Sequence, residues 1–416
     1  MRRFRLRLLT LTAAGLLVVS ACTPPKPAPL ATYLDPAGPV EARVGTSVTF
    51  EAQNFPGAVE WAVDGVVGGA PGIGSIADGL FVAPSRVPAM GAVVVSATSE
   101  SNPSETATAS VTITAPGTVY ILDETIYVLG ALDTVEGDVA ADRTFTLAGP
   151  ANSPIAMAGA PALDLAFIAA AWDSSRIVRV NSLSTATGEV TGTEFSTLGY
   201  TNPTGLAYDQ ERDILYALFE GALVAYHGAS TAGVGAVPDR VVAGPSLTDW
   251  FVNDSRLALD VANDRLFLAV SEWVTLGVYD DASALDGEVT PDRTMTLDAP
   301  ANFFWGLDYD ASRDELYVGD QKLGVGVYVV ANASAATGLV EPSRSLGGPT
   351  YPLQGASQVI YDVTNDRLVV IDAYGDDVKV YDDASTLNGD VAPTRVIGGP
   401  LLPIVYPFGG FIDPAQ

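Results

Sequence analysis

The sequence feature that most limits the possible folds is an internal repeat with a period of about 50 residues. Residues 276–293 (LGVYDDASALDGEVTPDR) return almost unchanged as residues 378–395 (VKVYDDASTLNGDVAPTR), and weaker copies occur elsewhere in the chain. Repeats of this length are typical of solenoids and propellers, in which each copy is one small unit that packs on its neighbours. The repeat therefore favours a ring or a linear stack of similar units.

Each copy contains four strand-like segments, which we call A to D. Strand A resembles residues 306–310, strand B residues 315–319, strand C residues 276–279 and strand D residues 293–297. A tight turn joins A to B, and a long loop with Gly and Pro joins C to D. Four antiparallel strands in one repeat of this length describe a propeller blade.

Charged residues recur at fixed places in these units. One aspartate ends strand A, a second follows the A–B turn, and an arginine begins strand D. The three series are Asp209, Asp260, Asp310, Asp362 and Asp413; Asp164, Asp213, Asp264, Asp314 and Asp366; and Arg143, Arg240, Arg293, Arg344 and Arg395. Because nearly every copy has them, we interpret these residues as structural, forming turns and tying neighbouring units together.

Counting the strands predicts how the ring closes. Complete sets of strands A to D begin near Pro154, Pro203, Ser255, Phe304 and Ala356. Strands B, C and D are left over at residues 118–123, 125–130 and 143–148, and one strand A is left over at residues 408–413. Joining these leftovers gives a sixth blade and removes the exposed strand edges of an open array. The pattern resembles NHL-like and related six-bladed bacterial propellers over nearly all of residues 117–416, a fold that hosts many unrelated activities.

Residues 34–115 are predicted to form a separate β-sandwich, because short alternating strands and turn residues follow one another there. Gly45, Trp61, Gly65, residues 72–74, Gly79 and residues 83–84 resemble bacterial immunoglobulin-like domains of surface proteins. We expect Trp61 to be the core aromatic residue of the third strand. The resemblance implies a spacer, with adhesion as the alternative.

The N-terminus reads as an export signal. In residues 1–22, four arginines precede an apolar run at residues 8–19 that is too short for a stable transmembrane helix. Residues 19–22 (VSAC) resemble a bacterial lipobox, which implies that Cys22 becomes the lipidated first residue. The prolines of residues 23–33 then form a semi-rigid tether. We expect a membrane-anchored lipoprotein of the cell envelope, at the outer membrane or the cell surface, with an ordinary signal peptide as the alternative.

Composition narrows the possible partners. The chain has a net charge of −28, and removing the signal segment makes it more negative. Such a surface repels nucleic acid, so we expect no nucleic-acid partner. One His and one Cys argue against His-based or Cys-based metal sites and internal disulfides. The lone His227 ends a C strand and has no catalytic partner that the sequence identifies, and the common catalytic motifs are absent. We name no catalytic residue, and enzyme activity stays open, with a binding role favoured.

The D–A and B–C loops share one face of a propeller, and this face carries the candidate binding residues. Carboxamides recur in the D–A loops at Asn152, Asn202, Asn253 and Asn302. Their oxygens suit Ca²⁺ or sugar hydroxyls, and Asn202, Asn253 and Asn302 are weak metal candidates. Asn before a strand also favours a turn, which is the structural alternative.

Aromatic residues gather in the same loops. They include Trp172, Trp250, Trp273, Trp305 and Tyr374, and acidic residues such as Asp123, Glu220, Asp320, Asp372 and Asp376 lie nearby in the sequence. Aromatic rings beside carboxylates can stack sugars or hold a cationic peptide. The alternative is that several rings wedge between blades as core.

The acidic C–D loops, including Asp280, Asp281 and Asp382, could chelate Ca²⁺, but the weaker copies lack these acids and favour an acidic surface. The expected function is therefore non-enzymatic binding of a protein, glycan or other envelope component on the D–A/B–C loop face. A metal-dependent hydrolase or lyase of the lactonase kind, acting at the tunnel mouth, is the first alternative. A purely structural surface-layer component is the second.

Overall fold

The structure is a computed structural model of the 416-residue chain. It describes residues 30–88, 90–149, 153–171, 175–244, 256–270, 275–301, 303–321 and 323–415. Within these ranges the chain is all-β, with short 3-10 turns between strands. The expected signal segment and Cys22 lie outside the described residues.

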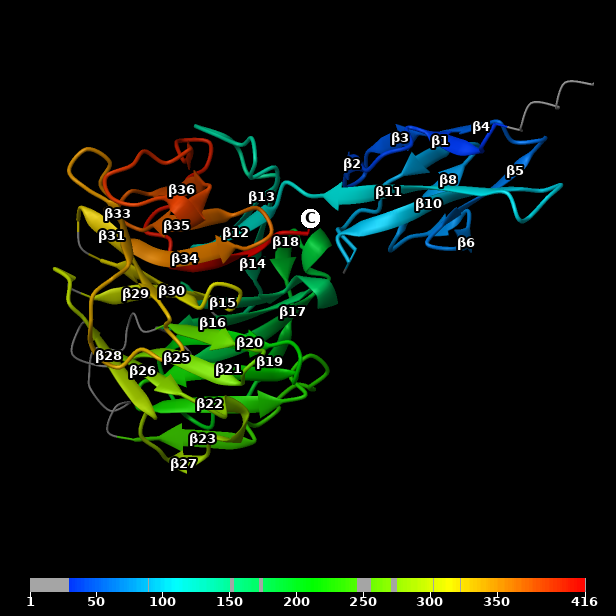
Figure 1. Cartoon of the computed structure of the whole chain (residues 1–416). Helices are drawn as coiled ribbons and strands as arrows, with labels where there is room; N and C mark the ends of the chain where they lie inside the picture. Colours follow the sequence, from blue (N-terminus) through cyan, green and yellow to red (C-terminus); the bar gives the residue numbers. More distant parts are fainter. Residues whose placement is uncertain are drawn as a thin grey trace, which may run out of the picture.

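Residues 33–114 form two facing sheets that enclose a common core (Figure 1). One sheet has the order β2 (Val40–Arg43), β11 (Thr106–Thr114), β10 (Ala92–Ser99), β5 (Val59–Val63), β6 (Val66–Val67). The other has the order β3 (Ser47–Thr49), β9 (Leu80–Val82), β8 (Gly74–Ala77), β7 (Gly69–Ala70), while β1 (Tyr33–Asp35) pairs with β4 (Glu51–Gln53).

The core of this sandwich differs from the expectation in one residue. Phe50 and Phe81 are its fully buried rings, whereas Trp61 on β5 is only half-buried and packs against the edge of the core. An added Cβ at Gly79 would lie 3.2 Å from the Trp61 ring, so the indole covers this glycine turn. The sequence pattern identified the strand correctly but not the ring that fills the core.

The remaining strands form a series of similar four-stranded antiparallel sheets, each named here by its innermost strand. The β38 sheet contains β38 (Gly409–Asp413), β12 (Thr118–Leu122), β13 (Ile126–Leu129) and β14 (Arg143–Leu147). The β15 sheet contains β15 (Ser153–Ala160), β16 (Leu165–Ala171), β17 (Arg176–Asn181) and β19 (Thr193–Phe195). The β20 sheet contains β20 (Pro203–Asp209), β21 (Ile214–Phe219), β22 (Ala222–His227) and β23 (Arg240–Ala243).

The second half of the array repeats the same order. The β24 sheet contains β24 (Leu257–Asp260), β25 (Arg265–Val270), β26 (Thr275–Tyr279) and β28 (Arg293–Leu297). The β29 sheet contains β29 (Phe304–Asp310), β30 (Glu315–Asp320), β31 (Val325–Ala331) and β33 (Arg344–Gly347). The β34 sheet contains β34 (Ala356–Asp362), β35 (Arg367–Asp372), β36 (Asp377–Asp382) and β37 (Arg395–Ile397).

The inner strands close into a cycle. Each of β15, β20, β24, β29, β34 and β38 contacts the next, and β38 contacts β15. The C-terminal strand β38 pairs antiparallel with β12, with Tyr120 opposite Phe411, and their two rings stack at 4.5 Å between centroids. The described sheets therefore form a β-propeller in which the two ends of the repeat array share one sheet (Figure 1).

The C–D loops contribute a contact that the sequence did not reveal. Short segments β18 (Gly188–Val190), β27 (Gly287–Glu288) and β32 (Gly338–Val340) pair parallel with the outer strand of the preceding sheet. Isolated bridges at Gly389 and Gly137 do the same for two further sheets. The repeated Gly in the most similar segment of the repeat thus serves to join neighbouring sheets.

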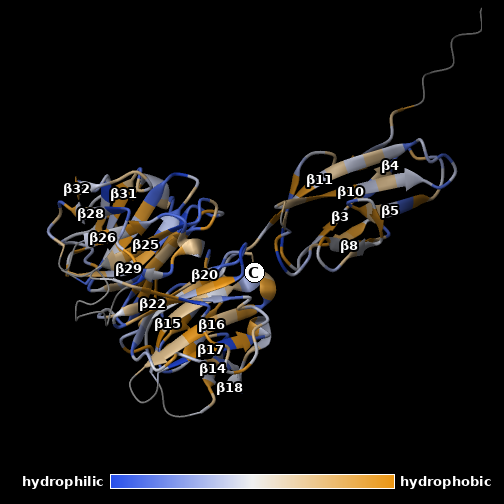
Figure 2. Ribbon diagram, turned by 90° about the horizontal axis from the view of Figure 1, so that it is seen from below, coloured by the Kyte–Doolittle hydropathy of each residue, from blue (hydrophilic) through white to orange (hydrophobic). Residues whose placement is uncertain are grey.

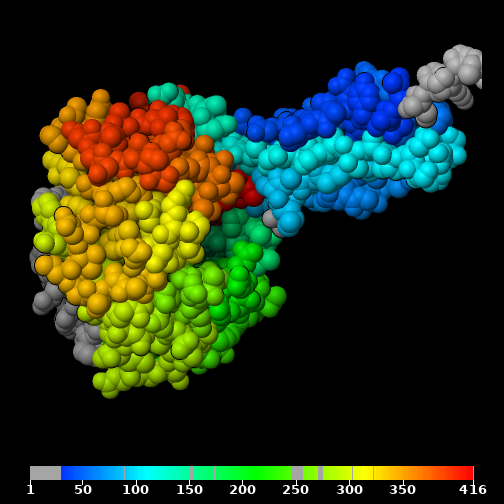
Figure 3. Space-filling view, in the orientation of Figure 1, coloured from blue at the N-terminus to red at the C-terminus, as the bar shows by residue number. Residues whose placement is uncertain are grey.

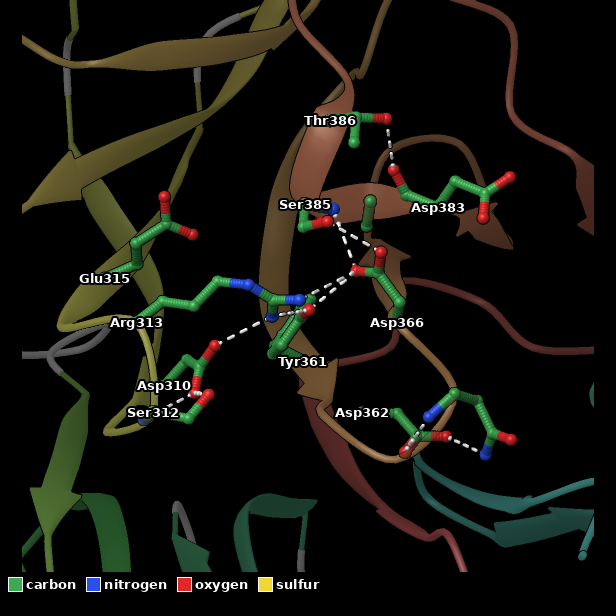
Figure 4. Close-up of polar contacts among 12 residues, drawn as sticks. Asp310, Ser312, Arg313, Glu315, Tyr361, Asp362, Asp366, Asp383, Ser385 and Thr386 are labelled. Atoms are coloured by element: carbon green, nitrogen blue, oxygen red, sulfur yellow. Dashed lines mark hydrogen bonds and ion pairs between the residues drawn. The ribbon is translucent and has the colours of Figure 1, made fainter.

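The recurring charges are structural, as predicted. The aspartate after each A–B turn has a positive φ and accepts a backbone N–H from a serine in the C–D loop. These pairs are Asp164 with Ser184, Asp213 with Ser230, Asp264 with Ser283, Asp314 with Ser334, and Asp366 with Ser385. Arginines of the same turns reach the next sheet: Arg212 donates to the carbonyl of Val261, and Arg313 binds both Asp310 and the Tyr361 hydroxyl (Figure 4).

The last aspartate of the strand A series is held by the other domain. Arg86 of the sandwich forms a bidentate ion pair with the buried Asp413, in which the guanidinium nitrogens lie 2.6 and 2.8 Å from the carboxylate oxygens. The backbone N–H of Val87 donates to the carbonyl of Ala415. Figures 2 and 3 show the sandwich meeting the propeller beside this C-terminal end.

Candidate functional site

The D–A and B–C loops emerge at one end of the antiparallel sheets and form the face that the sequence singled out. Of the candidate residues, the structure describes Asn202, Trp305 and Tyr374. The other candidates lie outside the described residues: Asn152, Asn253, Asn302, Trp172, Trp250 and Trp273. The predicted ring of carboxamides therefore stays a prediction.

An aromatic cluster lies on this face where the β29, β34 and β38 sheets meet. It consists of Trp305, Tyr374, Tyr406 and Phe408. The Trp305 ring lies 5.6 Å from Tyr374 and 5.8 Å from Tyr406, and Tyr406 lies 5.2 Å from Tyr374 and 5.3 Å from Phe408, all between centroids. Such tilted and edge-on pairs are the favourable arrangements of aromatic rings. Sequence positions far apart thus converge on one aromatic surface.

The members of the aromatic cluster differ in exposure. Trp305 is 1% exposed, so it supports the cluster from below and offers no stacking surface. Tyr374 is 45% exposed, and its hydroxyl accepts a hydrogen bond of 2.5 Å from the Gln321 side chain. The exposed, fixed ring of Tyr374 is therefore the part that can meet a ligand.

The acids at the ends of the B strands hold the loops of this face. Asp123, Asp320 and Asp372 are buried and accept backbone N–H bonds from Val405, Phe303 and Gln354 respectively. In the β20 sheet, Glu220 accepts a bond from the Asn202 side chain at 3.2 Å, and the backbone N–H of Asn202 donates to Ser175. These candidates therefore have structural partners that position the D–A loops, and the three aspartates among them are buried.

A second set of acids on this side is exposed. Asp376 accepts the backbone N–H of Tyr406 at 2.8 Å, and Asp138 accepts that of Leu401 at 2.6 Å. Asp390 accepts backbone N–H bonds from Thr350 and Tyr351, and the hydrogen bonds from Thr350 lower the pKa of Asp390. These carboxylates fix the loops and also keep negative charge at the surface.

The loops expose apolar side chains between these acids. They are Leu323, Tyr351, Tyr374, Leu401 and Val405, and their relative exposures lie between 43 and 67%. Because backbone hydrogen bonds hold several of these loops, a ligand does not have to order them on binding. Preorganised apolar residues in several loops of one face are typical of a binding surface.

The loops of the β29 sheet also form a pocket of about 460 Å³. Its lining includes Pro300, Leu323, Val325, Tyr328, Pro349 and Pro352. Tyr328 is 3% exposed, and its hydroxyl has no hydrogen-bond partner among the described residues. Burial, together with the charge of Asp320, raises the pKa of Tyr328 to about 12, so the hydroxyl stays protonated at neutral pH and can donate a hydrogen bond.

The centre of the propeller carries two charged side chains. Arg256, which is buried, donates to the carbonyls of Thr204 and Phe408 and so bridges the β20 and β38 sides of the ring. Asp308 on β29 accepts the backbone N–H groups of Tyr309 and Tyr361. Burial raises the pKa of Asp308 to about 7. Neither residue stands out in the sequence, because the equivalent positions in the other copies of the repeat hold different residues.

The opposite face does not assemble the C–D acids into a metal site. Asp280 pairs with Arg293 and Arg265, and the hydrogen bond from Arg293 lowers the pKa of Asp280. Asp382 pairs in the same way with Arg367 and Arg395. Among the described residues, no group of three His, Cys, Asp or Glu residues could hold a metal ion. His227 is exposed at the end of β22.

The described residues contain no helix that is long and apolar enough to cross a membrane. No protein-family model matches the chain, and no curated protein matches it either.

Solved structures with partial likeness include a chain of a nidogen/laminin complex, at 14% identity and a TM-score of 0.47, covering 71% of this chain and 97% of that one. A structural genomics protein of unknown function from Bacteroides thetaiotaomicron has 14% identity and a TM-score of 0.48, covering 89% and 90%. Hydrazine synthase of Kuenenia stuttgartiensis has 10% identity and a TM-score of 0.43, covering 62% and 70%. Likeness at this level carries no argument about function.

Proposed function

We propose that this protein is a non-enzymatic lipoprotein of the cell envelope whose propeller binds an envelope component on the D–A/B–C loop face. In this proposal Cys22 carries the lipid anchor, an immunoglobulin-like sandwich acts as a spacer, and six blades form the propeller. The spacer would hold the binding face away from the membrane.

The observation that carries the binding role is the aromatic cluster with the apolar side chains around it. Tyr374 is exposed, yet it is fixed by Trp305, Tyr406 and a hydrogen bond to Gln321. A rigid aromatic side chain loses little conformational entropy when it binds, so it makes an efficient contact. Two D–A loops and two B–C loops supply the exposed apolar side chains around it, which gives the face room for a macromolecule.

The purely structural alternative makes a different prediction for this face. A packing element has no need for an exposed tyrosine held by three neighbours, whereas a binding surface does. The hydrolase or lyase alternative has no observation in its favour among the described residues, and its predicted carboxamide ring lies mostly outside them.

The test compares matched exposed side chains on the two faces. Tyr374→Ser and Val405→Ser alter the binding face, and Val363→Ser alters an equally exposed valine in an A–B turn on the opposite face. We expect the first two variants to lose retention on isolated envelopes of the source organism by about tenfold or more, since each removes a contact of about 1.4 kcal/mol. Thermal unfolding should stay within a few degrees of the parent for Val405→Ser and Val363→Ser, because these side chains are exposed, and should be lower for Tyr374→Ser, because that ring packs on Trp305. Val405→Ser therefore carries the comparison with Val363→Ser at unchanged stability.

Equal retention of all variants would overturn the binding role of this face. If Val363→Ser loses as much retention as the other two variants, the effect is nonspecific, and this result would also count against the binding role of the D–A/B–C loop face.

A further inference from the structure

We infer that the pocket of the β29 sheet receives an apolar or aromatic side chain of a partner protein whose neighbouring residues are basic. This inference rests on the proposed function and names its ligand class: a cationic polypeptide segment rather than a glycan. It follows from the pocket's lining, from one buried hydroxyl and from the charges around the rim.

The lining selects for an apolar group. Prolines from two D–A loops, Pro300 and Pro349 with Pro352, line it together with Leu323 of the B–C loop and Val325 at the start of β31. Sugar recognition relies on many polar groups that pair with hydroxyls, whereas this pocket supplies mainly aliphatic carbon. Its volume of about 460 Å³ is in the range of pockets that take one small ligand or a large side chain.

Tyr328 supplies the polar group. Its hydroxyl is buried without a partner among the described residues, which costs stability unless something compensates. An entering polypeptide has main-chain carbonyls that can accept this hydrogen bond. A donor that the described residues leave unpaired beside the pocket favours a ligand that carries an acceptor next to its apolar part.

The rim favours positive charge. The exposed carboxylates of Asp298 and Asp390 belong to the loops on two sides of the pocket: Asp298 precedes Pro300 by two residues, and an added Cβ at Gly348 would lie 2.6 Å from the Asp390 side chain. The whole chain carries 49 acidic and 21 basic residues, so the approaching partner meets a negative field. Lys322, the lysine of the B–C loop, lies outside the described residues.

Three peptides serve as probes of these requirements: GKWKG, GEWEG and GKAKG. Binding to the full-length protein, without its signal segment, is followed through the methyl resonances of Leu323 and Val325. We expect GKWKG to bind at least about tenfold more tightly than either of the other two, one of which reverses the charge while the other removes the ring.

Two variants separate the pocket from the rest of the face. Tyr328→Phe should weaken GKWKG binding by about fivefold, without lowering the thermal stability, because it removes only a hydrogen bond to the ligand. Leu323→Gln should weaken it by a similar factor, whereas Leu339→Gln, at a similarly exposed leucine of β32 on the outer edge of the preceding β24 sheet, should not.

Equal affinity for GKWKG and GEWEG, or an unaltered affinity in both pocket variants, would overturn the inference. If envelope retention still depends on Tyr374 while the pocket variants retain fully, the binding face stands and the pocket assignment fails. If Tyr374→Ser also retains fully, both the proposed function and the inference fail.

Discussion

The β29 and β34 sheets are neighbours built from the same repeat, yet they differ at one position of strand C, which holds Tyr328 in the β29 sheet and Lys379 in the β34 sheet. Val318 of β30 faces Tyr328, and Val370 of β35 faces Lys379, so Tyr328 and Lys379 occupy equivalent places in their sheets. The strand B aspartate is also equivalent in the two sheets. The strand framework is therefore constant, and the difference between the sheets arises from single side chains and from the loops above them.

In the β34 sheet the position is filled by an ion-pair network. The Lys379 ammonium lies 2.7 Å from Asp372 and 2.6 Å from Asp377, and all three groups are largely buried. In the β29 sheet, Gly326 stands where Asp377 stands, Tyr328 replaces the lysine, and a pocket opens beside it. One sheet therefore uses this position for an internal ion-pair network, whereas the other has a pocket beside it, to which we assign a ligand.

The largest expected effect comes from breaking the network in the β34 sheet. Lys379→Met should lower the free energy of unfolding of the propeller by about 3 kcal/mol, because it leaves two buried carboxylates without their cation. Burial already raises the pKa of Asp377 to about 6, and without Lys379 it should rise further. Chemical unfolding followed by tryptophan fluorescence measures the loss.

The triple variant with Lys379→Met, Asp372→Asn and Asp377→Asn is the control, since it removes the buried charges as well. It should recover part of the lost stability. A single variant that is as stable as the parent would show that the network is solvated and that the contrast between the two sheets is smaller than the structure indicates.

A second difference between the same sheets lies at the centre of the ring. Asp308 of β29 has Ile360 of β34 as its equivalent, two residues before the aspartate that ends each strand. Because burial raises the pKa of Asp308 to about 7, the folded state binds a proton that the unfolded chain, with a pKa of about 3.9, does not hold between these values. This contribution to stability is full below pH about 4 and is lost as the pH rises through 7.

Asp308→Asn should remove this part of the pH dependence. The difference in unfolding free energy between parent and variant should change by up to about 1.4 kcal/mol per pH unit between pH 4 and 7, and flatten above pH 8. Asp377 titrates in a similar range, but it is present in both proteins and cancels in the difference. Parallel stability curves for the two proteins would mean that Asp308 has an ordinary pKa.

The sequence predicted the features that every copy shares and missed those that occur once. Strand starts at Pro203, Phe304 and Ala356 were placed correctly, because alternation and turn residues recur in each repeat. The shared C-terminal sheet followed from the leftover strands. The parallel pairing of C–D segments was not predicted, since two or three residues that pair with another repeat leave no local pattern.

The site shows the same division. Tyr374 was proposed as a binding residue from its type and its loop and stays a prediction, whereas the burial of Trp305 depends on packing against Tyr374 and Tyr406, which are distant in the sequence. The pocket joins prolines of two loops to a tyrosine of a third segment, and only the fold brings them together. Loops that differ between copies therefore carry the information that a repeat pattern cannot supply.

The smallest expected effect is the change in the free energy of unfolding when the buried hydroxyl of Tyr328 is removed. Tyr328→Phe removes a hydroxyl that is buried without a partner among the described residues, so the variant should be as stable as the parent or up to about 1 kcal/mol more stable. Tyr317→Phe in the same sheet is the matched control, because its buried hydroxyl contacts Glu315 and Arg344 and its loss should destabilise the protein by about 1 kcal/mol. Opposite signs for these two changes in thermal unfolding would show that the β29 sheet gives up stability at Tyr328. If Tyr328→Phe destabilises the protein as much as Tyr317→Phe does, the Tyr328 hydroxyl has a structural partner, and the contrast with Lys379 loses its functional meaning.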